Sequence, residues 1–204
     1  MVKFTTQLVS VFLLALVLVS NKGFAQDVNT SDPYKLVMDL GTQLFKAVGA
    51  AKEQQANSPE QMAVLVDSML MPYIDVPFAS YKILGSQLKK TTKEQRKGFV
   101  NAMQRDLTKT YSTALAQYND QIVNYAPARS VGNKRVVAVK TVLVSPGAPD
   151  VDMIFKLRKN KKTGQWKAYD LVVEGISLID AKRAELAKPL RDKGIVHVTG
   201  LISQ

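Results

Sequence analysis

The chain has 204 residues, 46% hydrophobic and 22% charged, a composition typical of a globular protein with one domain or two small ones. It contains no cysteine and one histidine, His197, which excludes disulfide frameworks, thiolate zinc sites, cysteine nucleophiles and multi-histidine metal centres. The formal net charge of +11 at pH 7 points to negatively charged partners.

Residues 1–25 have the pattern of an export signal. Lys3 supplies a positive charge, Leu8–Val19 is apolar apart from one serine, and Gly23-Phe24-Ala25 offers small residues where signal peptidase reads the chain. The apolar run of about a dozen residues is shorter than the roughly 20 that span a membrane. We therefore predict a cleaved Sec-type signal peptide and a single mature domain over residues 26–204, located in a bacterial periplasm.

Helix start signals fill the first half of the mature chain. Asp32-Pro33 places an N-cap before a proline at the first helical position, and Leu36, Leu40 and Leu44 then recur every four residues. Ser58-Pro59-Glu60-Gln61 is a capping box for a second helix.

Two more helices follow before the pattern changes. Asp75 predicts the start of a short helix that Gly85 closes. A long helix then opens with a capping box, which is either Thr92 with Gln95 or Thr91 with Glu94. Its apolar residues recur at four-residue spacing, as expected for a helix with one buried face.

The second half of the chain predicts strands and one final helix. Four segments rich in β-branched and aromatic residues are joined by short turns, which predicts an antiparallel, strongly twisted sheet. The predicted strands are Gln121–Ala126, Arg135–Ser145, Val151–Leu157 and Trp166–Glu174. Ser177 with Asp180 then forms a capping box for a helix that runs to Gly194.

Helices followed by strands predict an α+β fold in one domain, with helices packed on a four-stranded antiparallel sheet. Val136–Val139 and Val142–Val144 are continuously apolar, which is typical of strands buried on both faces. The pattern leaves two arrangements open: a filled core with helices on one face, or a sheet and helices held apart around an apolar cavity.

Three segments resemble a known family. Met71–Gly85 is similar to its aromatic-rich short helix ending in Leu-Gly, and Trp166–Leu178 resembles its signature strand, W-x-x-x-D-x-x-x-E-G-x-S. Leu190–Ile195 matches its closing helix and turn. In the same order along the mature chain, these segments resemble the MlaC-type periplasmic phospholipid-binding proteins, also called the toluene-tolerance auxiliary component.

The resemblance implies an NTF2-like fold with a deep apolar pocket for phospholipid acyl chains. It also implies a carrier that moves lipid between a lipoprotein–porin complex at the outer membrane and an inner-membrane ABC transporter, whose MCE-domain subunit receives the lipid. Such a carrier maintains the lipid asymmetry of the outer membrane. It needs no cofactor, metal or catalytic pair, and no headgroup-specific cage, because it has only to match the hydrocarbon of a bilayer.

Strand alternation predicts which side chains line the lipid site. Alternate residues share a face, so we expect Tyr169, Leu171 and Val173 on one face and Trp166, Ala168 and Asp170 on the other. The full predicted lipid-binding set is Met69, Ile74, Phe78, Tyr81, Leu84, Val137, Val139, Leu143, Met153, Phe155, Tyr169, Leu171 and Val173. For each of these, ordinary core packing is the alternative.

Two other function classes stay open at this stage. An enzyme on this fold would need polar groups in its pocket, and the candidates are Asp170, Glu174 and Tyr169. An acid at the end of a strand, however, more often stabilises a turn. A binding module for envelope components with a filled core is the second alternative.

Basic residues predict how the chain meets its partners. Outside the inner membrane, anionic lipid surfaces and acidic protein faces are more available than nucleic acid. The predicted docking residues are Lys89, Lys90, Arg96, Arg158 and Lys161. The alternative is that the excess lysine only keeps the protein in solution.

Overall fold

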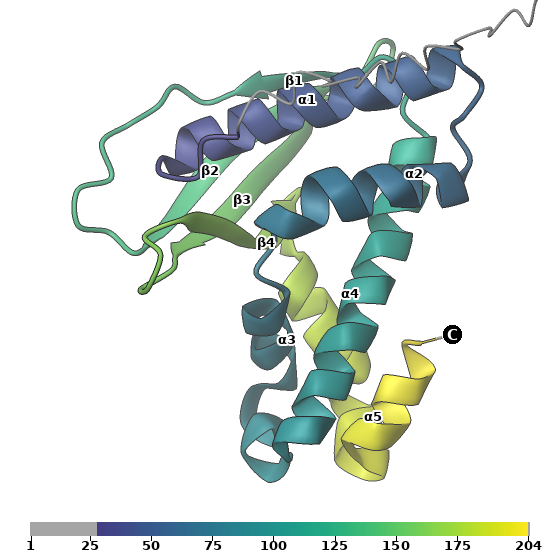
Figure 1. Cartoon of the computed structure of the whole chain (residues 1–204), viewed down its shortest axis with the longest axis vertical. Helices are drawn as coiled ribbons and strands as arrows, with labels where there is room; N and C mark the ends of the chain where they lie inside the picture. Colours follow the sequence, from purple (N-terminus) through teal and green to yellow (C-terminus); the bar gives the residue numbers. More distant parts are fainter. Residues whose placement is uncertain (1–27, 204) are drawn as a thin grey trace, which may run out of the picture.

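The computed structural model describes residues 28–203 (Figure 1). Its helical elements are α1 (Pro33–Glu53), α2 (Pro59–Leu65), the π-helix η1 (Val66–Leu70), the 3-10 helix η2 (Met71–Tyr73), α3 (Val76–Leu84), the 3-10 helix η3 (Gly85–Lys90), α4 (Lys93–Ala116) and α5 (Leu178–Leu201). The strands are β1 (Ile122–Tyr125), β2 (Val136–Val144), β3 (Val151–Lys159), β4 (Trp166–Val173) and β5 (Ile176–Ser177). The predicted signal peptide lies outside the described residues.

The helices begin where their capping residues predict. The Asp32 carboxylate accepts hydrogen bonds from the first N–H groups of α1, and Asp75 accepts one from the first turn of α3. Ser58 with Gln61 forms a reciprocal capping box, as does Thr92 with Gln95, so the long helix starts after Thr92. Each cap of this kind contributes about 1 kcal/mol.

The strands form one antiparallel sheet in the order β1-β2-β3-β4-β5, which confirms the α+β class. Over the described part of the chain the sheet has five strands, where the sequence predicts four. Glu174 and Gly175 both adopt positive φ, at 49° and 80°, and turn the chain back on itself. Ile176 and Ser177 can therefore pair with the end of β4 before α5 begins.

One face of the sheet is covered by α1 and the other is open along β2. Val137 and Val139 are buried against Leu36 and Val37 of α1, whereas Val136 is 55% exposed. The prediction that Val136–Val139 is buried on both faces was wrong, since within residues 28–203 no helix covers the outer side of β2. Figure 1 shows α1 lying along the sheet while α3, α4 and α5 extend away from it.

Strict alternation fails within β4. The register with β3 shifts by one residue at a bulge, which leaves Tyr169 without a paired residue on β3. Ala168 and Trp166 consequently lie on the same face as Leu171, so their predicted place on the opposite face was wrong. Beyond a bulge, each side chain points to the face opposite the one that strict alternation predicts. The residue pattern of β4 does not predict where the bulge occurs.

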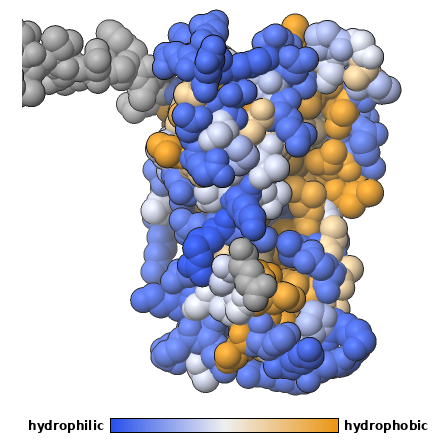
Figure 2. All heavy atoms as spheres, turned by 90° about the vertical axis from the view of Figure 1, so that its right-hand side faces the viewer, coloured by the Kyte–Doolittle hydropathy of each residue, from blue (hydrophilic) through white to orange (hydrophobic). Residues whose placement is uncertain are grey.

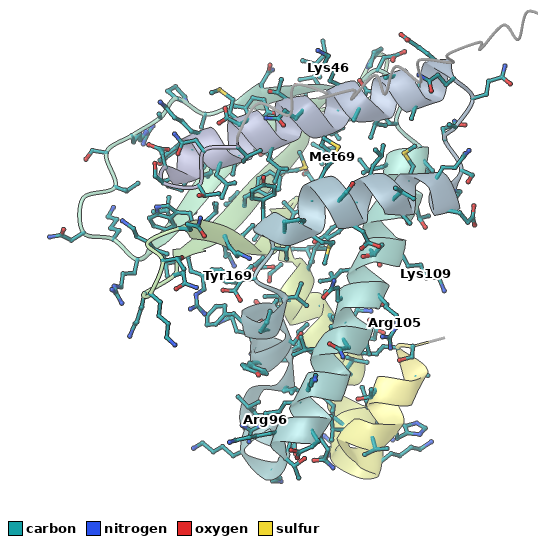
Figure 3. All side chains as sticks on the ribbon, in the orientation of Figure 1. Lys46, Met69, Arg96, Arg105, Lys109 and Tyr169 are labelled. Carbon is teal, nitrogen blue, oxygen red and sulfur yellow. The ribbon has the colours of Figure 1, made fainter. Side chains whose placement is uncertain are left out.

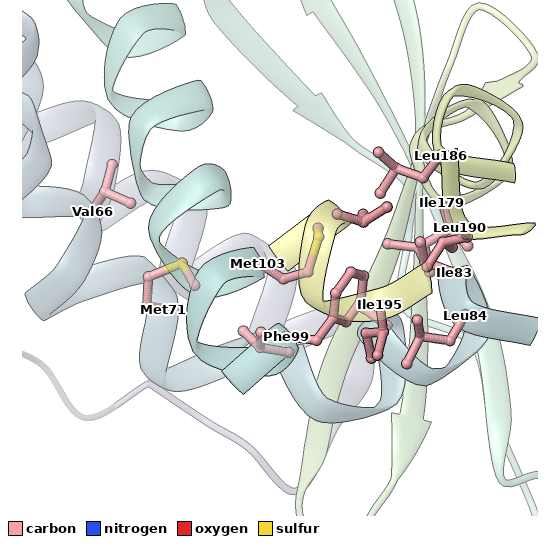
Figure 4. Close-up of a cluster of buried hydrophobic side chains, with 13 residues drawn as sticks. Val66, Met71, Ile83, Leu84, Phe99, Met103, Ile179, Leu186, Leu190 and Ile195 are labelled. Carbon is pink, nitrogen blue, oxygen red and sulfur yellow. The ribbon is translucent and has the colours of Figure 1, made fainter. Parts of the chain in front are cut away.

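The helices build a second hydrophobic core, which Figure 4 shows in close-up. Phe99 and Met103 of α4 pack there against Ile83 of α3 and Leu186 and Leu190 of α5. Helix α5 bends at Gly194, where φ is 75°, and then continues to Leu201, beyond its predicted end. Ile195 and Val198 follow the bend and are buried in the same core, which explains why the chain resumes a helix there.

Candidate functional site

A cavity of about 370 Å³ lies between the covered face of the sheet and the helices. Its walls come from α1, η1, η2, α3, α4, β3, β4 and the first turns of α5, and they are mostly apolar. The volume falls within the roughly 300–1,000 Å³ that is typical of small-molecule sites. The structure therefore has the arrangement in which sheet and helices are held apart around an apolar cavity.

Helix α1 supplies one wall. Leu36, Leu40 and Leu44 line the cavity together with Val37 and Phe45, because residues three and four apart share one face of a helix. The sequence prediction included none of these five in the site, although the four-residue leucine spacing marks the helix face that they form.

The sheet supplies the opposite wall. Met153, Phe155 and Leu157 alternate along β3 and face the cavity with Leu171 of β4. The bulge adds Ala168, which strict alternation would have turned outward.

Helix α4 lines the cavity with Met103, Leu107 and Tyr111. Burial, with a smaller effect from the charge of Asp170, raises the pKa of Tyr111 to about 12. The phenol therefore keeps its proton at physiological pH and can donate a hydrogen bond.

The ring of Tyr169 connects the cavity to α3. It meets the ring of Phe78 edge to face, with 5.0 Å between ring centroids. The guanidinium carbon of Arg158 lies 4.1 Å from the centroid of the Phe78 ring, and Arg158 Nε is 3.4 Å from Asp75 Oδ2. This stack fastens α3 to β3 and β4 beside the cavity.

The structure brings part of the predicted lipid-binding set to the cavity. Ile74, Met153, Phe155, Tyr169 and Leu171 are among its lining residues.

The other members of the set lie elsewhere. Val137 and Val139 pack around the buried Trp166, and Leu84 belongs to the helical core. Met69 lies between α1 and α2, where it packs beside Leu44 (Figure 3). Phe78 packs on Tyr169 and Tyr81 is exposed. Leu143 and Val173 are half-buried on the covered face of the sheet.

The two acids of the signature strand have structural contacts. Asp170 accepts hydrogen bonds from Lys156 Nζ, Ser177 Oγ and the Ile179 N–H. Glu174 is exposed and accepts a hydrogen bond from the Asp152 N–H. Each acid therefore fastens a turn or a neighbouring strand.

The predicted docking residues are spread over two ends of the molecule. Lys89 and Lys90 are exposed at the end of η3, and Arg96 lies near them at the end of α4 farthest from the sheet (Figure 3). Arg96 donates hydrogen bonds to the side chain and carbonyl of Thr91. Lys161 is exposed in the turn between β3 and β4.

Residues 28–203 have neither a metal-binding cluster nor a membrane-spanning helix. They contain no cluster of three or more His, Cys, Asp or Glu side chains that could hold a metal ion. In residues 28–203 no helix has the length and apolar character needed to cross a membrane. The face shown in Figure 2 is largely hydrophilic, with hydrophobic side chains gathered along one side of it.

The family model described as "MlaC protein" matches residues 39–204. The chain belongs to the MlaC family. This membership confirms the resemblance found in the sequence. The matched region includes every helix and strand after the first turns of α1, and so almost the whole cavity.

Two curated relatives support the assignment. The chain is 28% identical over 170 residues to the intermembrane phospholipid transport system binding protein MlaC of Haemophilus influenzae, covering 83% of this chain and 78% of the relative. It is 26% identical over 165 residues to the toluene tolerance protein ttg2D of Pseudomonas putida, covering 79% and 74%.

A solved structure has the same fold. The phospholipid-binding protein of Ralstonia solanacearum, determined in complex with a phospholipid, superposes with a TM-score of 0.75 at 20% identity. The match covers 84% of this chain and 94% of that protein, which confirms the arrangement of helices on a twisted antiparallel sheet.

Proposed function

We propose that this MlaC-family chain is a periplasmic phospholipid carrier and not an enzyme. The single observation that carries the proposal is the apolar cavity enclosed by α1, α4, α5 and the covered face of the sheet. The names of the relatives from Haemophilus influenzae and Ralstonia solanacearum, which refer to phospholipid transport and binding, support the same cargo.

Apolar walls are sufficient for this task. Each acyl methylene removed from water contributes about 0.8 kcal/mol, so two chains of about 16 carbons gain some 25 kcal/mol before any cost. A bilayer offers nearly the same gain. A carrier with such walls can therefore accept lipid from one membrane and release it to another, and net direction comes from its partners.

The export signal supports the proposed location, and the family resemblance implies the proposed partners. Residues 1–25 would be removed on export, leaving residues 26–204 as one phospholipid-binding domain in the periplasm. The carrier would then exchange lipid with an outer-membrane lipoprotein–porin complex and with the MCE-domain subunit of an inner-membrane ABC transporter, and so maintain outer-membrane lipid asymmetry.

The cargo is tested on residues 26–204 purified from a bacterial periplasm without detergent. The protein is denatured and extracted with organic solvent, and the extract is analysed by mass spectrometry. We expect phospholipid in near-stoichiometric amount. A lipid-free extract from protein that is folded by circular dichroism would contradict the carrier function and favour a binding module.

Docking through the basic residues is tested by ionic strength. Exposed charges separated by more than about 10 Å are screened at 0.1 M salt, so association driven by them slows as salt rises. We expect a steep salt dependence of the association rate with the purified MCE-domain subunit, reduced by the double substitution Lys89→Glu and Lys90→Glu. An association rate that does not change with salt would exclude this docking mode.

A further inference from the structure

The charged side chains of the cavity lie in two places. Among the described residues that line it, Asp106, Asp170, Lys182 and Glu185 carry charge. Asp170 already accepts three hydrogen bonds, from side chains of β3 and β5 and from an N–H in the first turn of α5. The other three side chains come from α4 and α5 and form one group, which we name the rim cluster: Asp106, Lys182 and Glu185.

Lys182 is the centre of the rim cluster. Its Nζ is 3.3 Å from Asp106 Oδ2 and 3.2 Å from Glu185 Oε2. Exposure rises across the cluster, with the side chains of Asp106, Lys182 and Glu185 being 20%, 26% and 58% exposed. The cluster therefore lies where the cavity reaches solvent, while the leucines of α1 line its interior.

The rim cluster has an excess of negative charge. Burial lowers the pKa of Lys182, but the charges of Asp106 and Glu185 outweigh this effect and raise the pKa above its usual value. Lys182 is therefore protonated at physiological pH. Two carboxylates and one ammonium give the cluster a formal charge of −1.

This charge pattern complements a zwitterionic group. A phosphate beside an ammonium can place its oxygens near Lys182 and its own ammonium near Asp106 and Glu185. A headgroup that carries only a phosphate charge would meet the same Lys182, but without a cation to offset the two carboxylates. Like charges held close together oppose binding, so the cluster disfavours an anionic headgroup.

We propose that the rim cluster is a headgroup subsite that favours phospholipids bearing phosphoethanolamine over those bearing phosphoglycerol. The inference rests on the proposed carrier function and adds a preference that an apolar cavity alone would not have. The contacts are partly exposed, and exposed ion pairs contribute about 0.2–1 kcal/mol. A tenfold ratio requires about 1.4 kcal/mol, so we expect a selectivity of about 1.4- to fivefold.

The test loads delipidated residues 26–204 from vesicles containing equal amounts of phosphatidylethanolamine and phosphatidylglycerol with identical acyl chains. The protein is reisolated at low salt and extracted, and both lipids are quantified by mass spectrometry. We expect the wild type to enrich phosphatidylethanolamine about 1.4- to fivefold. The double variant Asp106→Asn, Glu185→Gln leaves Lys182 as the only charge of the cluster, so the ratio should fall to one or below.

The matched control is Glu174→Gln, Asp180→Asn. It removes the same two negative charges from exposed carboxylates that do not line the cavity, and it changes the attraction to anionic vesicles equally. We expect this control to keep the wild-type ratio. If the Asp106 substitution prevents folding, the single variant Glu185→Gln at the most exposed position should still lower the ratio.

The outcomes separate the two levels of the proposal. A wild-type protein that takes up both lipids in the vesicle ratio, or a control that shifts as far as the rim variant, overturns the headgroup subsite and leaves the carrier intact. A folded wild-type protein that takes up neither lipid overturns the carrier function and this inference with it.

Discussion

Lys156 on β3 and Asp170 on β4 form an ion pair across the sheet, with Lys156 Nζ 2.9 Å from Asp170 Oδ2. The Asp170 side chain is 2% exposed, and it also accepts hydrogen bonds from Ser177 and the Ile179 N–H. One carboxylate thus joins two strands to the start of α5. The position of the α5 wall of the cavity depends on this junction.

Asp170→Ala should destabilise the protein by about 2–4 kcal/mol, because it leaves the buried Ile179 N–H without an acceptor and removes a buried partner of Lys156. Thermal or urea unfolding measures the loss. The control Asp150→Ala removes an exposed carboxylate in the turn after β2 and should change stability by less than about 0.5 kcal/mol. If Asp170→Ala were as stable as Asp150→Ala, the Asp170 contacts would contribute nothing to the stability of the fold.

Gly41 and Gly49 on α1 offer a matched pair. A Cβ at Gly41 would overlap the hydroxyl of Tyr125, whereas a Cβ at Gly49 meets no atom within 4 Å. Alanine in a helix interior is favoured over glycine by about 1 kcal/mol, so Gly49→Ala should stabilise the protein. Gly41→Ala should instead cost about 1–3 kcal/mol through overpacking.

A second substitution tests whether overlap with Tyr125 causes the loss of stability expected for Gly41→Ala. Tyr125→Phe removes the overlapping oxygen, so adding it to Gly41→Ala should recover part of the loss. A Gly41→Ala protein as stable as Gly49→Ala would mean that the Tyr125 ring moves away at no cost. Unfolding midpoints of the four variants and the wild type decide the matter.

Alkaline pH should weaken the fold through Tyr111. Burial raises its pKa from 10.0 to about 12, so the folded state holds the phenolic proton more tightly than the unfolded chain. This pKa shift contributes about 2–3 kcal/mol to the free energy of unfolding. The contribution is fully present below pH 10 and is lost as the pH rises through 12. Unfolding free energies from pH 8 to 12 should therefore fall more steeply for the wild type than for Tyr111→Phe; parallel curves would contradict this.

Lipid content should depend on both walls of the cavity. Phe155→Asp on β3 and Leu40→Asp on α1 each place a charge among apolar lining residues, so either should abolish copurified phospholipid in protein that still folds. Val64→Asp is the control, since Val64 is 68% exposed on α2 and does not line the cavity. Lipid retained by Phe155→Asp or Leu40→Asp would remove that residue from the site.

Local signals in the sequence predicted the elements well. Asp32-Pro33, Ser58 with Gln61, and Thr92 with Gln95 set the helix starts, because capping depends on residues three or four positions apart. The four main strands and the helix-then-sheet order gave the α+β class, and the motif of β4 gave the family.

The site was only partly accessible from the same signals. Ile74 and Phe155 were predicted in the lining, but Leu40 of α1 was not, because nothing local states which helix faces a cavity instead of a filled core. Ala168 was assigned to the wrong face, since a bulge depends on how two strands pair and not on the strand itself.

The sequence by itself determined where the helices and strands begin, the class of fold, and the family. Only the tertiary structure decided that these elements stand apart around a cavity, and that Asp106 of α4 meets Lys182 of α5 at its edge. The physical reason is that capping and periodicity act within a few residues of the chain. A cavity and its charged edge depend instead on contacts between segments that lie far apart in sequence.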